Sequence, residues 1–315
     1  MIIRPYKPKD FNDILAMIHK KFMKAKEHNP NLPVPLFLDS ITKDKLPKDL
    51  VVATKNDKVV GYIGGYFLDD INSHPNGFLT TLSLYGVCDN ENKRYVLFKL
   101  IQMISDVALK KASHNLAMIV HAYDKETLDI LVDLGYGKLT LDLIREVETI
   151  ALKPLEGLEI ETVTKDDLAL LMPLFIGIQD HLMASPIYLH DSDLYDSIIP
   201  YYKAQLEEGT NGLFMAKVKG QIVGYIKYTT SQVNRQELDA KSTLGINGAY
   251  ILPDFRNQSI MDYLLNQVIL KAKEIGYTHI MTDCETANFE AVNYWKKHFE
   301  PYSYGLLRHI NSLKK

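Results

Sequence analysis

Residues 245–261 read Gly-Ile-Asn-Gly-Ala-Tyr-Ile-Leu-Pro-Asp-Phe-Arg-Asn-Gln-Ser-Ile-Met, and this stretch decides the fold of the chain. Its apolar first part predicts a strand, which runs into a short turn after Pro253, and the turn opens a helix. Such a turn presents backbone N–H groups and the positive end of a helix to an anion. We therefore expect a strand, a turn and a helix that together bind a negatively charged group.

A second helix is predicted about thirty residues further along the chain, again after a strand. It begins in residues 288–295, which read Asn-Phe-Glu-Ala-Val-Asn-Tyr-Trp. Asn288 is a preferred residue for capping a helix, and its amide can also bind a ligand. The small side chain of Ala291 leaves room for that ligand on the same side of the helix.

The two halves of the chain resemble each other, which indicates a duplication. Val59–Ile63 reads Val-Val-Gly-Tyr-Ile, and Ile222–Ile226 reads Ile-Val-Gly-Tyr-Ile, each after a strand-like run and a polar turn. Such pairs of strands predict hairpins. A repeat of this length predicts two domains that each bury a core. The segment 153–157 is the natural linker, so we expect domains at 1–153 and 157–315.

Amphipathic helices also recur in the two halves. One helical stripe, Phe11, Ile14, Leu15, Ile18 and Phe22, has its counterpart in Leu168, Leu171, Leu174, Phe175 and Ile178. A second stripe, Leu97, Leu100, Ile101, Ile104 and Ala108, has its counterpart in Met261, Leu264, Leu265, Val268, Ala272 and Ile275, which is followed by Gly276. Each half then reads strand, helix, hairpin, strand, helix, strand, helix, strand. This order predicts an α/β fold with a mixed, mostly antiparallel sheet flanked by helices.

The segments 245–261 and 288–295 resemble the coenzyme A pyrophosphate site of the GNAT superfamily of N-acetyltransferases. The family's turn reads Arg/Gln-x-x-Gly-x-Gly/Ala after a Pro-Asp-aromatic lead, and residues 253–256 match that lead and its arginine. Ser259 and Met261 replace the two small residues. The resemblance covers nearly the whole chain and implies two tandem GNAT-like domains.

The resemblance implies acetyl-CoA or another acyl-CoA as the co-substrate of the C-terminal half, with no metal. Ser259 keeps a small side chain and adds a hydroxyl donor for an anion, and forcing it to positive φ, where glycine is at ease, would cost about 1 kcal/mol. Met261 is expected either to crowd the diphosphate or to point into the core. The residues expected to contact the cofactor are Tyr250, Ile251, Arg256, Asn257, Gln258, Ser259, Ile260, Met261, Asn288 and Trp295.

The N-terminal half departs further from the family pattern. Its strand end, residues 85–88, is followed by Asp-Asn-Glu-Asn-Lys-Arg, so Asp89 and Glu91 lie where a phosphate would bind. Like charges there would oppose the cofactor. We therefore interpret this half as a degenerate GNAT-like domain with a structural or substrate-shaping role.

In a GNAT reaction an amine attacks the thioester carbonyl directly, so the enzyme needs a base and an acid. Glu285 is the first candidate for the base, and Asp283 is expected on the same side of that strand. Trp295 holds the place of the family's usual acid, Tyr. Tyr294 is the candidate acid, although one residue turns a helix by about 100°; core packing is the alternative. His298 is a further candidate catalyst.

The acceptor is expected against residues 180–202, which are rich in tyrosine, histidine and aspartate. Aromatic and acidic side chains suit a cationic amine. A tyrosine-rich helix packed on the sister domain is the alternative interpretation of this segment.

Composition restricts the class of protein. The chain has 315 residues, 46% hydrophobic and 24% charged residues, and a net charge of −3. These values argue against a nucleic-acid binder and are typical of globular proteins. Two cysteines and no apolar signal core indicate buried thiols in a cytoplasmic protein without a membrane span. We expect a monomer or homodimer.

The sequence leaves three functions open. The first is an acetyl-CoA-dependent N-acyltransferase that acts on the primary amine of a small molecule or peptide. The second is a non-catalytic acyl-CoA-binding or sensor protein built on a degenerate GNAT pair, and the third is a tandem scaffold without coenzyme A.

Overall fold

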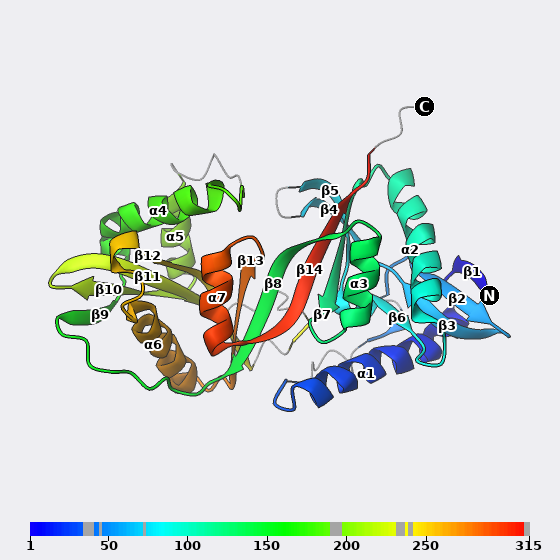
Figure 1. Ribbon diagram of the computed structural model, residues 1–315, viewed down its shortest axis with the longest axis horizontal. Helices are drawn as coiled ribbons and strands as arrows, with labels where there is room; N and C mark the ends of the chain where they lie inside the picture. Colours follow the sequence, from blue (N-terminus) through cyan, green and yellow to red (C-terminus); the bar gives the residue numbers. More distant parts are fainter. Residues whose placement is uncertain are drawn as a thin grey trace. The chain divides into compact units, whose positions relative to one another are not determined.

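The computed structural model describes residues 1–33, 41–43, 46–71, 74–189, 197–230, 237–238 and 242–311. The chain forms two compact units, which can be followed by colour in Figure 1. Unit 1 comprises Met1–Asp142, Gln236–Asp239 and Pro301–Lys315, and unit 2 comprises Leu143–Arg235 and Ala240–Glu300.

Unit 1 contains two sheets. The first has the strand order β1-β2-β3-β6 and is antiparallel, and the second contains β4-β5-β7-β14, in which β5 and β7 are parallel. The elements of this unit are β1 (Ile2–Pro5), η1 (Pro8–Asp10), α1 (Phe11–His28), β2 (Val51–Lys55), β3 (Lys58–Ile63), β4 (Tyr66–Ile71), β5 (His74–Thr80), η4 (Leu82–Leu84), β6 (Tyr85–Val87), α2 (Lys93–Lys110), β7 (Asn115–His121), α3 (Lys125–Asp133), the first part of β8 (Gly137–Glu146), and β14 (Glu300–His309).

Unit 2 has one sheet of order β9-β10-β11-β12-β13, antiparallel except for the parallel pair β12 and β13. Helices α4 and α5 lie on one side of this sheet and α6 on the other (Figure 1). The elements are β9 (Leu158–Thr162), η5 (Lys165–Leu171), α4 (Met172–Met183), α5 (Ile198–Glu207), β10 (Asn211–Val218), β11 (Gln221–Thr229), β12 (Thr243–Ile251), η6 (Pro253–Phe255), α6 (Ile260–Glu274), β13 (His279–Glu285) and α7 (Phe289–His298).

Both predicted hairpins are present, and their turns explain why. Asn56 and Asp57 join β2 to β3, and Lys219 and Gly220 join β10 to β11. All four residues have positive φ, between 49° and 82°. Two-residue turns with positive φ match the twist of the strands that they join. The polar turn residues therefore fix both hairpins locally.

The helices bury the faces that their spacing predicts, with one change of phase. In α1 the buried residues include Ile14, Ile18 and Phe22. In α6 the buried residues begin with Ile260, and the predicted first member of the stripe, Met261, is only half-buried. Gly276 has a φ of 83° and follows α6, as expected of a residue that ends a helix.

The two compact units do not divide the chain at one point. The last strand, β14, belongs to unit 1 and pairs antiparallel with β7, from Ser303↔His121 to His309↔Asn115. The last residues of β8 belong to unit 2, where Val147 N donates a hydrogen bond to Thr278 O at 2.9 Å. The expected domains, 1–153 and 157–315, describe the duplicated halves and stay a prediction. The compact units differ from these halves because the final strand of each half contributes residues to the other unit.

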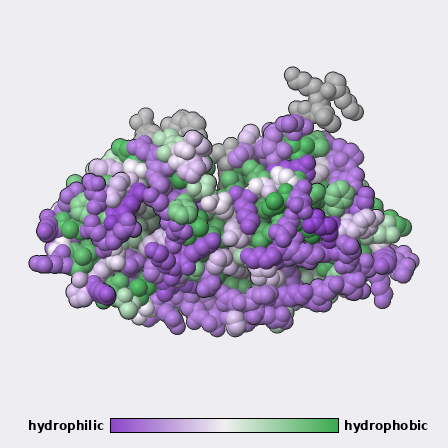
Figure 2. Space-filling model, in the orientation of Figure 1, coloured by the Kyte–Doolittle hydropathy of each residue, from purple (hydrophilic) through white to green (hydrophobic). Residues whose placement is uncertain are grey.

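Hydrophilic residues cover most of the face that Figure 2 shows, with apolar residues in scattered patches. Among the helices of the described residues, none combines the length and apolarity that crossing a membrane requires.

Candidate functional site

Strands β12 and β13 separate halfway along β12, and this opening is the centre of the candidate site. The two strands pair from Thr243↔His279 to Ile246↔Thr282. Among the described residues, the strand that pairs with β12 beyond Ile246 is β11. One backbone edge of residues 247–251 is therefore left for an extended ligand, in the way that an added strand binds to a sheet edge.

A β-bulge lies where the strands separate. Ile226 pairs with Ala249 and Tyr228 pairs with Ile246, so Asn247 and Gly248 together lie opposite the single residue between positions 226 and 228. Asn247 is exposed, and Gly248 is half-buried. Bulges re-aim backbone groups and are frequent beside active sites. A bulge at this place is therefore consistent with a segment whose backbone groups bind a ligand.

The turn after β12 has the conformation of an anion-binding loop. Asn257 has a φ of 61° and Ser259 a φ of 60°. Asn adopts this left-handed region readily, whereas Ser does so at a cost of about 1 kcal/mol. Ser259 is exposed and immediately precedes α6, whose first backbone N–H groups have no partner within the helix. Ser259 thus has the positive φ whose cost the sequence analysis weighed.

Arg256 connects the two sequence segments that make up the site. Its Nε donates to Ile251 O at 3.2 Å, and its Nη1 forms an ion pair with Glu290 Oε2 at 2.5 Å. Its guanidinium also lies 5.5 Å from the ring centroid of Tyr250. The end of β12 and the first turn of α7 are therefore held together, although the sequence analysis did not single out Glu290.

Asn288 caps α7, as predicted. Its Oδ1 accepts a hydrogen bond from Ala291 N at 3.2 Å, and the side chain is 8% exposed. The same oxygen lies 3.2 Å from His181 Nε2, which therefore carries the proton, since an amide oxygen can only accept. His181 is in α4, so this contact joins the segment expected to bind the acceptor to the segment expected to bind the cofactor.

Comparisons with known proteins agree with this geometry. Residues 176–299, which include the splayed strands and both segments, match the model of the acetyltransferase (GNAT) family. The chain contains a GNAT acetyltransferase domain. A search among curated proteins finds no match.

Solved structures extend the fold to the whole chain. A GCN5-related N-acetyltransferase from Sphaerobacter thermophilus has a TM-score of 0.60 and 13% identity, and the match covers 99% of this chain and 96% of that one. A GCN5-related glucosamine N-acetyltransferase region of a fungal multi-domain β-N-acetylglucosaminidase has a TM-score of 0.51 and 13% identity over 97% of this chain and 38% of that one. A tandem GNAT protein from the clavulanic acid biosynthesis pathway has a TM-score of 0.49 and 14% identity over 99% of both chains. At these identities, the two likenesses with TM-scores above 0.5 show the fold alone.

Within the GNAT domain, Tyr294 contacts an acid. Its hydroxyl donates to Asp262 Oδ1 at 3.0 Å, and His298 Nε2 lies 3.0 Å from the same oxygen. Burial, reinforced by the negative charge of Asp262, raises the pKa of Tyr294 far above its usual range. Burial lowers the pKa of His298, although Asp262 opposes this shift. A phenol whose proton is held by a carboxylate is a poor proton donor.

Trp295, at the place of the family's usual acid, packs in the interior. It is 6% exposed, and its ring meets that of Phe299 edge-on at 5.4 Å. This packing leaves Trp295 little surface for the expected cofactor contact. Ile260, another expected contact, is 1% exposed, so its side chain is in the core and its backbone N–H is the group that remains for a ligand.

Glu285 ends β13 on the far side of the opening from β12. Cys284 beside it is buried, whereas Asp283 is exposed and Glu285 half-buried. This alternation places the two carboxylates on one side of the strand, as expected. Glu285 O also accepts from Asn288 N at 3.0 Å, which ties the end of β13 to the start of α7. Of the predicted catalytic residues, Glu285 is the one positioned at the opening.

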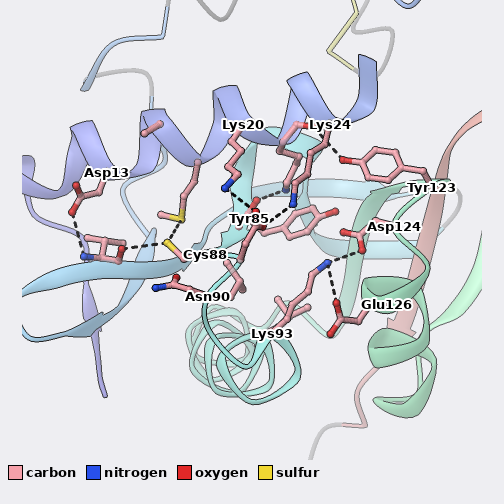
Figure 3. Close-up of a pocket in the computed structure, with 18 of the residues that line it drawn as sticks. Asp13, Lys20, Lys24, Tyr85, Cys88, Asn90, Lys93, Tyr123, Asp124 and Glu126 are labelled. Atoms are coloured by element: carbon pink, nitrogen blue, oxygen red, sulfur yellow. Dashed lines mark hydrogen bonds and ion pairs between the residues drawn. The ribbon is translucent and has the colours of Figure 1, made fainter. Parts of the chain in front are cut away.

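Unit 1 contains a cavity at the equivalent place, with a volume of about 840 Å³. It lies between α1, β6 and the N-terminal ends of α2 and α3 (Figure 3). Lys20 and Lys24 of α1 each contact Asp89 at 2.7 Å, and Lys55 contacts Glu91 at 3.2 Å. The two acids expected to repel phosphate are therefore paired with lysines, which weakens the repulsion that the sequence predicts.

A half-buried lysine occupies the strand edge in this cavity instead. Lys21 Nζ donates to Leu82 O at 2.9 Å and to Tyr85 O, and it lies 3.1 Å from the ring centroid of Tyr85. Burial lowers the pKa of Lys21 to about 7. The first carbonyl of β6, Tyr85 O, is therefore already bound, as is Leu82 O in η4 just before it. This geometry supports the interpretation of unit 1 as degenerate.

Proposed function

We propose that this protein is an N-acyltransferase that moves an acyl group from acetyl-CoA, or another acyl-CoA, to the primary amine of a small molecule or peptide. The observation that carries the proposal is the splay of β12 from β13, which runs into the positive-φ turn and α6 within the GNAT domain. No step of the proposed reaction needs a metal.

The proposed cofactor site is built from three parts. The open edge of residues 247–251 would hydrogen-bond the amides of the pantetheine arm. The turn 256–259 and the N-terminal end of α6 would bind the diphosphate through backbone N–H groups, with Arg256 adding charge. Asn288, at the start of α7, would lie beside the arm. Tyr250, Asn257, Gln258 and Met261 remain proposed contacts of this site.

In the proposed reaction the amine nitrogen bonds to the thioester carbonyl carbon. The carbon–sulfur bond then breaks, and coenzyme A leaves as a thiolate that takes the surplus proton of the attacking nitrogen, directly or through water. Backbone N–H groups at the bulge would stabilise the negative charge on the carbonyl oxygen. Glu285 is the proposed base that takes the proton from the ammonium, directly or through water. Because Asp262 holds the proton of Tyr294, we do not assign the acid to Tyr294.

Two assays test this function. Calorimetry with coenzyme A should show binding at a single site, and thiol release from acetyl-CoA should depend on an added amine. Binding without thiol release across a broad amine panel would favour the sensor alternative. Absence of binding at millimolar coenzyme A would remove both of these functions and leave the scaffold.

A further inference from the structure

Lys227 of β11 lies opposite the bulge at which β12 leaves β13. It is the residue between Ile226 and Tyr228, whose partners on β12 lie on either side of Asn247 and Gly248. A Cβ built on Gly248 would be 3.6 Å from Lys227 Cβ. The sequence analysis did not single out this residue, although a lone lysine in the apolar run of β11 is an available signal.

The ammonium of Lys227 is buried beside one amide oxygen and two aromatic rings. The side chain is 3% exposed, and its Nζ donates to Gln205 Oε1 at 2.9 Å. The ring centroids of Tyr202 and Tyr201 lie 4.8 Å and 5.5 Å away. Among the described residues no carboxylate forms an ion pair with Lys227. Burial lowers its pKa to about 8, so most molecules carry the charge at neutral pH.

A buried cation of this kind is costly unless something compensates it. One amide oxygen and two aromatic faces offset part of the cost and favour the charged form over the neutral amine. Lys217 on the neighbouring strand β10 shows the ordinary arrangement, because it contacts Glu161 at 2.6 Å. A side chain needed only for packing would be apolar here, so the charge indicates a missing anion.

That anion is separate from the coenzyme A diphosphate. The proposed diphosphate site follows Ile251, three residues along β12 from Gly248, and a strand advances about 3.3 Å per residue. The diphosphate would therefore bind about 10 Å or more from the level of Lys227. The thioester that reaches the bulge is neutral. The remaining source of negative charge is the acceptor.

We propose that Lys227 binds a carboxylate of the acceptor, so that the substrate is an amino acid or a related amine that carries a carboxylate. This inference rests on the proposed function. Lys227 contacts α5, and Tyr201, which is 51% exposed, leads from its ammonium to solvent. A carboxylate bound there would hold the amine of the same molecule near the bulge, where the thioester is expected.

The test uses amino acids and their C-terminal amides as matched acceptors in a thiol-release assay. The wild-type protein should prefer the carboxylate over the amide. Lys227→Met should raise KM for the carboxylate acceptor about tenfold or more, the loss expected for a charge-assisted hydrogen bond, and should abolish the preference. Lys227→Arg should retain part of it. Lys217→Met is the matched control and should change neither value.

Calorimetry with coenzyme A and thermal unfolding of each variant separate binding from folding. Equal use of acids and amides by the wild type, or an unchanged preference in folded Lys227→Met, would overturn the inference. If no amine releases thiol, the proposed function fails by itself. Binding of the free amino acids is then measured by calorimetry: binding lost in Lys227→Met supports the carboxylate site, and no binding to the wild type overturns it.

Discussion

Arg256 is the side chain through which the proposed cofactor site can be tested most directly. In the structure it pairs with Glu290, whereas the proposed function requires it to contact phosphate. The two side chains are 28% and 60% exposed, and such pairs contribute about 0–1 kcal/mol to stability. A phosphate can therefore replace Glu290 at little cost. We expect Arg256→Gln to weaken binding and Glu290→Gln to strengthen it.

The magnitudes follow from the type of interaction. A hydrogen bond to a charged group contributes about 1.5–3 kcal/mol, so Arg256→Gln should raise the Kd for coenzyme A by about tenfold to 150-fold. Arg256→Glu should weaken binding further, because it places a negative charge beside the diphosphate. Glu290→Gln removes a competitor that is largely exposed, so its gain should be about twofold to fivefold.

The assay is calorimetric titration with coenzyme A at low and high salt, with thermal unfolding as the control for folding. The wild-type affinity should fall with salt more steeply than that of Arg256→Gln, because exposed charges are screened. A folded Arg256→Gln variant with unchanged affinity would refute the reasoning and assign Arg256 to bracing the turn through Ile251 O. A Glu290→Gln variant that binds more weakly would refute the competition between carboxylate and phosphate.

Three further predictions concern single side chains. Glu285→Gln should lower turnover by about 10²–10⁴-fold and leave the Kd for coenzyme A unchanged, and a pH–rate profile that keeps its acidic limb would contradict its role as the base. Tyr294→Phe should change turnover by less than about threefold, because Asp262 already holds the phenol proton; a loss near 100-fold in steady-state assays would restore Tyr294 as the acid. His121 is buried, and burial lowers its pKa to about 3, so the unfolded state takes up the proton first as pH falls. The free energy of unfolding should therefore decline from about pH 6.5 toward pH 3, by at most about 1.4 kcal/mol per pH unit from this group. Denaturant unfolding of His121→Phe should show a shallower decline, and an equal slope would exclude His121 as a source.

The backbone conformation of Ser259 shows what a sequence motif can predict about a turn. The sequence places a non-glycine residue where the family has glycine, and the structure accommodates it at a φ of 60°. The conformation of a turn is local, so a spacing of residues can predict it. Whether Arg256 in the same turn is available to a ligand depends on Glu290, which is 34 residues away in the sequence and meets it only after α7 has packed.

The contacts of Asp262 illustrate what the motif could not supply. It accepts from Tyr294 and lies beside His298, two residues that the sequence analysis considered as catalysts. Helical spacing predicts which residues share a face of one helix, but it does not give the phase in which two helices meet. The same limit explains Met261, which the pattern placed in the buried stripe of α6 and which is half-buried in the structure.

The sequence by itself determined the hairpins, the amphipathic helices and the resemblance of the C-terminal half to its family, because turn residues and periodic apolar positions act over short stretches of chain. Tertiary structure alone decided that β14 pairs with β7, that a bulge opens β12 from β13, and that Lys227 faces that bulge without a carboxylate among the described residues. These features depend on strand register and helix packing between residues far apart in the chain. The free energy that stabilises them comes from packing the assembled core, and no single segment supplies it.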